Sequence, residues 1–189
     1  MSKSFISVVL ILLVSCNNDT SVKTVTDNST IKKDTVKVTD TVGPRVTSGK
    51  IDIETFGPVK IGQPGTATTQ AIGQPTSKSK AEEWGADGLI HQEWNYNRLN
   101  LVINMAYPPG KETEAIIFSI TANGSNTFKT RANVGIGNTY EEISQAYQRD
   151  IDKEQSNKNI ITVGSVYGGI IFSFEDGKAY RVFLGPAAE

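Results

Sequence analysis

The chain is short of cysteine, histidine and net charge, and each shortage excludes a class of protein. Cys16 is the only cysteine in 189 residues, so no disulfide can form within the chain and no site can be built from several cysteines. His91 is the only histidine, and no G-x-S-x-G motif is present, so histidine-based hydrolase sites are poorly supported. The formal charge of -1 leaves no basic footprint, which argues against a nucleic acid partner.

Long apolar runs are also missing. The longest is the ten-residue stretch Phe5–Val14, which is too short to cross a bilayer as a helix but has the proportions of a signal-peptide core behind Lys3. The sequence therefore predicts a signal peptide over residues 1–15.

The segment Leu13-Val14-Ser15-Cys16 resembles the lipobox of bacterial lipoproteins. This resemblance implies that the Cys16 sulfur carries diacylglycerol, that residues 1–15 are removed, and that the new amino terminus is acylated. Several acyl chains anchor a protein stably to a membrane. Asn17, by its similarity to enterobacterial sorting signals, favours the outer membrane, with the protein facing the periplasm. An ordinary signal peptide followed by a chance cysteine is the alternative.

Residues 17–50 contain no aromatic side chain and few aliphatic ones, while Thr, Asp and Lys are abundant. Such a composition cannot bury enough apolar surface to offset the entropy lost on ordering. We expect residues 16–50 to form a lipidated cysteine and a flexible tether. The alternation in residues 35–39 leaves open an isolated strand.

A repeated motif organises the remaining chain. Val59-Lys60-Ile61-Gly62 is followed by Gln70-Ala71-Ile72, and 75 positions later Val134-Gly135-Ile136-Gly137 is followed by Gln145-Ala146-Tyr147. Self-similarity at a fixed offset indicates tandem structural units. We predict two helix-plus-sheet units, over residues 51–124 and 125–189, in an α+β fold.

The second unit has clear local signals. Residues 139–142 fit a capping box at a helix start, and Ile143, Ala146 and Tyr147 form an apolar stripe behind it. Strands are predicted over residues 160–163, 168–174 and 180–184, with a tight turn at Asp176-Gly177 between the last two. The unit should be a helix followed by an antiparallel meander.

The first unit repeats this order of elements, but its signals for a helix are weaker. A helix is predicted over residues 66–72, ended by Gly73 with Pro75 beyond it, and a second short helix over residues 80–84. Strands are expected at 90–96, 99–105 and 115–122. Trp94-x-Tyr96 matches Phe172-x-Phe174 at an offset of 78, which extends the predicted repeat into the strands.

These motifs resemble the helix-plus-sheet unit of outer-membrane assembly lipoproteins of the BamE (SmpA) type, and two in tandem resemble the β-lactamase inhibitor protein family. The resemblance covers about residues 55–185 and implies this architecture. The chain differs in having Gln63-Pro64 and in lacking the cysteines of the secreted inhibitors. The residues that carry it are Ile61, Gly62, Ile72, Gly73, Pro75, Trp94 and Tyr96 in the first unit, and Ile136, Gly137, Ala146 and Tyr147 in the second.

Residues that could carry chemistry are few. His91 and Glu93 lie on one face of a predicted strand and could supply two metal ligands, although zinc needs more; a solvated strand face is the simpler interpretation. Gly135-x-Gly137 lacks the residues of a phosphate loop and favours a close backbone approach before a helix. No catalytic residue, metal site or cofactor is predicted.

Aromatic residues are more informative. Most should form the core, but exposed Trp and Tyr often anchor protein interfaces. Trp84, Trp94, Tyr96 and Tyr107 are the predicted partner-binding residues. The sequence thus favours a non-enzymatic, lipid-anchored envelope protein that binds another protein. One alternative is an inhibitor of a periplasmic hydrolase, which would need a rigid, exposed aromatic or acidic loop between the units, such as residues 107–114. The other is a metal-binding protein or enzyme centred on His91.

Overall fold

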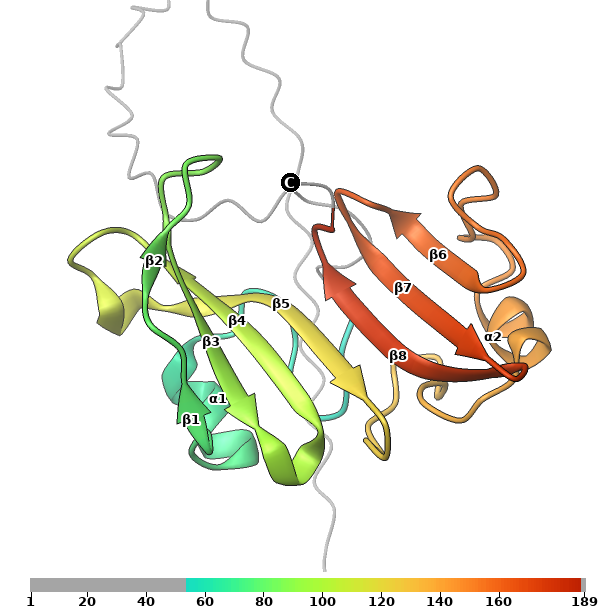
Figure 1. The fold of residues 1–189 in the computed structure, drawn as a ribbon, viewed down its shortest axis with the longest axis horizontal. Helices are drawn as coiled ribbons and strands as arrows, with labels where there is room; N and C mark the ends of the chain where they lie inside the picture. The colour runs from blue at the N-terminus through green and yellow to red at the C-terminus, as the bar shows by residue number, and fades with distance from the viewer. Residues whose placement is uncertain (1–53, 188–189) are drawn as a thin grey trace, which may run out of the picture. The chain divides into compact units, whose positions relative to one another are not determined.

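Eight strands form one antiparallel sheet in the computed structural model, which describes residues 54–187 (Figure 1). The predicted signal peptide, Cys16 and the predicted tether lie outside the described residues. The strand order is β1-β3-β4-β5-β8-β7-β6, with β2 also pairing with β3. The strands are β1 (Ser77–Lys78), β2 (Glu82–Glu83), β3 (Ile90–Tyr96), β4 (Leu101–Tyr107), β5 (Ile116–Asn123), β6 (Ile160–Ser165), β7 (Gly168–Glu175) and β8 (Lys178–Gly185).

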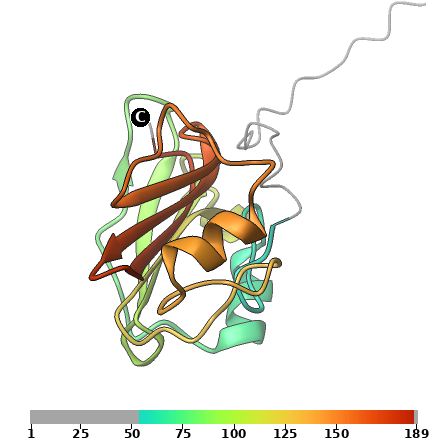
Figure 2. The same cartoon turned by 90° about the vertical axis from the view of Figure 1, so that its right-hand side faces the viewer.

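Both α-helices of the described region, α1 (Gly65–Ile72) and α2 (Tyr140–Ala146), lie on the same side of this sheet (Figures 1 and 2). The apolar core lies between them and the sheet. Phe56 and Val59, from the segment before α1, are fully buried in it. The long strands contribute alternate residues, so that Ile103 of β4, Ile120 of β5 and Phe172 of β7 all face the helices.

The predicted elements of the second unit are confirmed. Thr139 and Glu142 form the capping box, and Asp176 and Gly177 adopt the positive φ angles of 48° and 76° that a tight hairpin requires. One detail differs: Ile143 is buried but Ala146 is exposed, because α2 is only two turns long and packs mainly through Ile143 and the Tyr147 that follows it.

In the first unit, the helix and the three long strands are confirmed, and Gly73 ends α1 with a φ of 84°. The predicted helix over residues 80–84 is wrong. This segment runs along the edge of β3, where Glu82 and Glu83 form β2 and the Ser79 N–H donates to the Glu93 carbonyl at 2.9 Å. Pairing with an exposed strand edge satisfies more backbone groups here than one helical turn would.

The offset of 78 between Trp94-x-Tyr96 and Phe172-x-Phe174 does not relate equivalent strands. The first motif lies on β3, the first long strand after α1, whereas the second lies on β7, the second strand after α2. The connection from α1 to β3 is longer because it contains β1 and β2. The offset of 75 holds for the two helices but not for the strands.

The two predicted units share one sheet. Ile120–Asn123 of β5 pair with Arg181–Leu184 of β8, so the expected boundary between residues 124 and 125 falls in the turn after β5 rather than between separate cores. We call this pairing the β5–β8 junction.

The capping box makes one contribution to stability depend on pH. The Thr139 N–H donates to Glu142 Oε2 at 2.9 Å, and the Asn138 amide donates to the same oxygen at 2.8 Å, which together lower the pKa of Glu142 from 4.5. A carboxyl with a lowered folded-state pKa stabilises the fold above its unfolded pKa and loses that effect as the pH falls.

We therefore expect the free energy of unfolding to fall less between pH ~7 and pH ~3 in Glu142→Gln than in the wild type. Thr139→Ala should lower the free energy of unfolding by about 1 kcal/mol at neutral pH. Urea unfolding at the two pH values measures both effects. Equal pH dependence in wild type and Glu142→Gln would contradict this account of the helix cap.

Candidate functional site: the open face of the sheet

The face of the sheet opposite α1 and α2 carries no helix within the described residues (Figures 1 and 2). Residues that alternate with the core point to this face. It includes His91 of β3, Asn104 of β4, Thr121 of β5, Ile171 of β7 and Phe183 of β8, as the strand register requires. We call it the open face.

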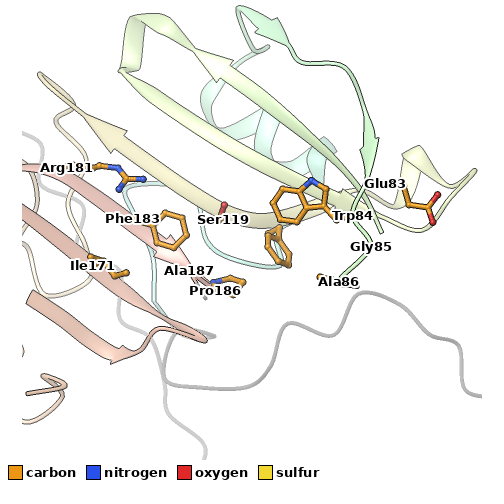
Figure 3. Close-up of a pocket in the computed structure, with 11 residues that line it drawn as sticks. Glu83, Trp84, Gly85, Ala86, Ser119, Ile171, Arg181, Phe183, Pro186 and Ala187 are labelled. Atoms are coloured by element: carbon orange, nitrogen blue, oxygen red, sulfur yellow. The ribbon is translucent and has the colours of Figure 1, made fainter. Parts of the chain in front are cut away.

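A groove of about 690 Å³ lies on the open face (Figure 3). Its walls come from the turn after β2, from β5, from β7, and from β8 with the residues that follow it. We call it the sheet groove. The residues that line it are Glu83, Trp84, Gly85, Ala86, Phe118, Ser119, Ile171, Arg181, Phe183, Pro186 and Ala187.

One wall of the sheet groove is held by a buried polar cluster. The His91 ring, only 3% exposed, stacks on Trp84 with 3.6 Å between ring centroids and 5° between planes. His91 Nδ1 lies 2.8 Å from Asn104 Oδ1, and Nε2 lies 2.9 Å from Asp87 Oδ2. The edge of Phe118 completes the cluster, with its centroid 4.7 Å from that of His91. These contacts fix the position of Trp84.

The same contacts use both nitrogens of His91 inside the protein, so neither offers a lone pair to an external ligand. Glu93 lies on the same face of β3 but is exposed. Within residues 54–187 no group of three or more His, Cys, Asp and Glu side chains is placed to hold a metal ion. The geometry assigns His91 to the support of Trp84.

Arg181 lines the sheet groove at the end opposite Trp84, and its guanidinium carbon lies 5.9 Å from the centroid of Phe183 (Figure 3). Across the strands it faces Asn123 of β5 and Ser173 of β7, which are both neutral. It makes no hydrogen bond or ion pair with any residue of the described region. Arg181 is therefore a half-exposed cation that has no counter-charge among residues 54–187.

Of the four aromatic residues predicted to bind a partner, only Trp84 lines the sheet groove. Trp94, Tyr96 and Tyr107 are 7%, 3% and 6% exposed and belong to the core. The alternation of β3 and β4 directs them toward the helices, and Lys78 Nζ covers Trp94 at 4.1 Å from the ring centroid. They therefore offer little surface to a partner, and their predicted role in partner binding stays a prediction.

The sequence reasoning missed Phe118, Phe183 and Arg181. The sequence does contain a signal for the orientation of Phe183, because its neighbours Val182 and Leu184 are apolar enough to be core residues. With Val182 and Leu184 in the core, Phe183 had to point to the other face.

The loop over residues 107–114 connects β4 to β5 and so lies within the first unit rather than between the units. Its aromatic residue, Tyr107, is buried. Burial is the main cause that raises the pKa of its hydroxyl, and the nearby Glu112 carboxylate raises it further. The exposed part of the loop is polar, with Lys111 Nζ 3.2 Å from Glu114 Oε1. This loop therefore has no exposed aromatic residue, whereas the carboxylates of Glu112 and Glu114 are exposed, and the inhibitor alternative stays a prediction.

The Tyr96 hydroxyl is buried and has no hydrogen-bond partner in the described region. Burial raises its pKa from 10.0 to about 12. We expect Tyr96→Phe to leave the free energy of unfolding unchanged or raise it by up to about 1 kcal/mol, because an unpaired buried polar group is removed.

The raised pKa adds a pH dependence. Between pH 10.0 and about pH 12 the tyrosine is ionised in the unfolded chain but still neutral in the folded protein. The free energy of unfolding is therefore unaffected by this group below pH 10.0 and falls as the pH rises through this range. Tyr96→Phe should therefore lose less stability than the wild type between neutral pH and pH ~11, measured by urea unfolding. A large loss of stability at neutral pH would show that the hydroxyl is bonded.

Comparisons with known proteins add no identification: no protein-family model, no curated protein and no solved structure matches this chain. Among residues 54–187, no helix has the length and apolar character needed to cross a bilayer.

Proposed function

We propose that this chain is a non-enzymatic, lipid-anchored protein of the bacterial cell envelope that binds another protein through the open face of its sheet. The observation that carries the proposal is the sheet groove, which combines Trp84, Phe118, Phe183 and Arg181 on a face that neither α-helix of the described region covers. Trp and Arg are enriched among residues that dominate binding energy in protein interfaces.

The His91 cluster supports this function by pre-organising one wall of the groove. Trp84 stacks on the His91 ring and meets Phe118 edge-on, so little side-chain entropy should be lost when a partner packs against it. Asp87 and Asn104 satisfy the imidazole that holds it, which limits the cost of burying a polar ring.

The proposed architecture is two tandem helix-plus-sheet units joined at the β5–β8 junction. In both, a short helix precedes three long antiparallel strands, and the first unit also contains the two-residue strands β1 and β2. Val59 and Val134 are both buried, and Gly62 and Gly137 both have positive φ angles, 77° and 84°. The junction brings the last strand of each unit to the centre of one sheet, so a partner would contact both units at the groove.

The anchor is proposed to be the lipid on Cys16, with the folded part facing the periplasm from the outer membrane. Cross-linking in intact cells followed by mass spectrometry, comparing wild type with Cys16→Ala, tests both parts. We expect a reproducible envelope protein whose capture falls when the anchor is lost. Equal capture of soluble hydrolases by both forms would favour an inhibitor, and the absence of any reproducible protein would contradict the proposal.

A further inference from the structure

The sheet groove has one cation and one anion among its lining residues, and they lie far apart along it. Arg181 lies beside Phe183, whereas the Glu83 carboxylate lies beyond Trp84 and is directed away from Arg181 (Figure 3). The groove between them is lined by neutral and aromatic side chains. The Arg181 end therefore has an uncompensated positive charge next to apolar surface.

Arg181 is suited to bind a carboxylate. A guanidinium presents donors in a planar fork that matches the two oxygens of a carboxylate, and such charge-assisted pairs are stronger than neutral hydrogen bonds. The Phe183 ring beside it, with its centroid 5.9 Å from the guanidinium carbon, lies within the range of a cation–π contact. No carboxylate of the described region competes for it.

A partner finds little strand edge to pair with on this sheet, because one edge consists of the two-residue strands β1 and β2 and the outer edge of β6 is already bridged. The outer edge of β3 pairs with β1 and β2, and at the outer edge of β6 Ile151 bridges to Val163 while the Gly164 N–H donates to the Asp150 carbonyl. Recognition through main-chain pairing at an edge is thus disfavoured, and recognition through side chains on the open face remains.

We propose that the sheet groove receives a segment of a partner protein in which an Asp or Glu side chain stands next to apolar side chains. The carboxylate binds the Arg181 guanidinium, and the apolar side chains pack against Phe183, Phe118 and Trp84. This inference rests on the proposed function and adds the chemistry of the partner.

The test selects a library of short random displayed peptides on the full chain in detergent. Enriched peptides are synthesised with each acidic residue intact or converted to its amide, and Kd is measured by fluorescence anisotropy. We expect enrichment of Asp or Glu next to Leu, Phe, Tyr or Trp. Arg181→Gln should raise the Kd of the acidic peptides at least about tenfold, because one charge-assisted pair is lost. The Kd of the amide forms should change little.

Two further variants sharpen the result. Arg181→Lys keeps the charge but loses the fork and should give an intermediate Kd. Arg149→Gln removes an exposed arginine in the turn after α2, away from the groove, and should bind like the wild type. If Arg149→Gln weakens binding as much as Arg181→Gln does, the net charge of the protein explains the effect and the inference is wrong.

The remaining outcomes separate the inference from the proposed function. Peptides that need Phe183 but carry no carboxylate would overturn the inference and leave the groove as a protein-binding site. Binding that depends on no residue of the groove would overturn both. If sedimentation shows a wild-type dimer that Arg181→Gln dissociates, the occupant is a second copy and the inference is wrong.

Discussion

Phe172→Ala should lower the free energy of unfolding by about 3–5 kcal/mol, the range for removing a buried phenylalanine ring. Phe172 is 0% exposed, lies in the middle of β7, and packs against Tyr147 at the end of α2 with ring centroids 5.9 Å apart. Its removal leaves a cavity between the sheet and the helix. Urea unfolding at neutral pH measures the change.

The neighbouring residue is the matched control. Ile171 is also a large apolar residue of β7, but it points to the open face and lines the sheet groove. Ile171→Ala should lower the free energy of unfolding by less than about 1.5 kcal/mol, because the side chain is half-exposed and leaves no closed cavity. Equal losses in the two variants would contradict the assignment of one covered face and one open face.

Phe183→Ala should weaken partner binding by about 2 kcal/mol, or roughly thirtyfold in Kd, while the fold is retained. Phe183 lines the sheet groove beside Arg181 and lies between Thr121 of β5 and Ile171 of β7. A ring in this position combines apolar contact with support for the guanidinium. Binding is measured with the partner or peptide isolated by the experiments above, and folding by circular dichroism and urea unfolding.

A surface position on the helix side controls for non-specific effects. Gln145 of α2 is exposed and lies on the covered side of the sheet, so Gln145→Ala should bind as the wild type does. If Phe183→Ala binds normally while remaining folded, the centre of the groove is not the contact surface. If Gln145→Ala is the weaker binder, the helix side is the interface instead.

Local sequence signals predicted much of this fold. The capping box at Thr139, the stop at Gly73 and the turn at Asp176-Gly177 act within a few residues, and the structure has all three. The helix predicted over residues 80–84 is wrong because Glu82 and Glu83 pair with Ile90 and His91 of β3, a strand contact that the pattern within the segment does not show. Short segments have too little intrinsic preference to resist such pairing.

The candidate site was harder to predict for a related reason. Trp94 and Tyr96 were recognised as aromatic, but only the register with β4 and the position of the helices decide that they face the core. Arg181 is ordinary in the sequence; it becomes notable because Asn123 and Ser173 lie beside it and neither neutralises it. Ser173 lies across the β7–β8 hairpin, but Asn123 comes from β5, a distant segment whose pairing with β8 cannot be deduced from one sequence.

The measurement that tests the central claim most directly is photo-cross-linking from single positions in intact cells. A photoreactive amino acid at Ile171, inside the sheet groove, is compared with one at Gln145, on the covered side. If the open face binds a partner, the Ile171 position should give a discrete adduct with one envelope protein, and the Gln145 position should not. An adduct from Gln145 alone, or the same products from both positions, would contradict the claim.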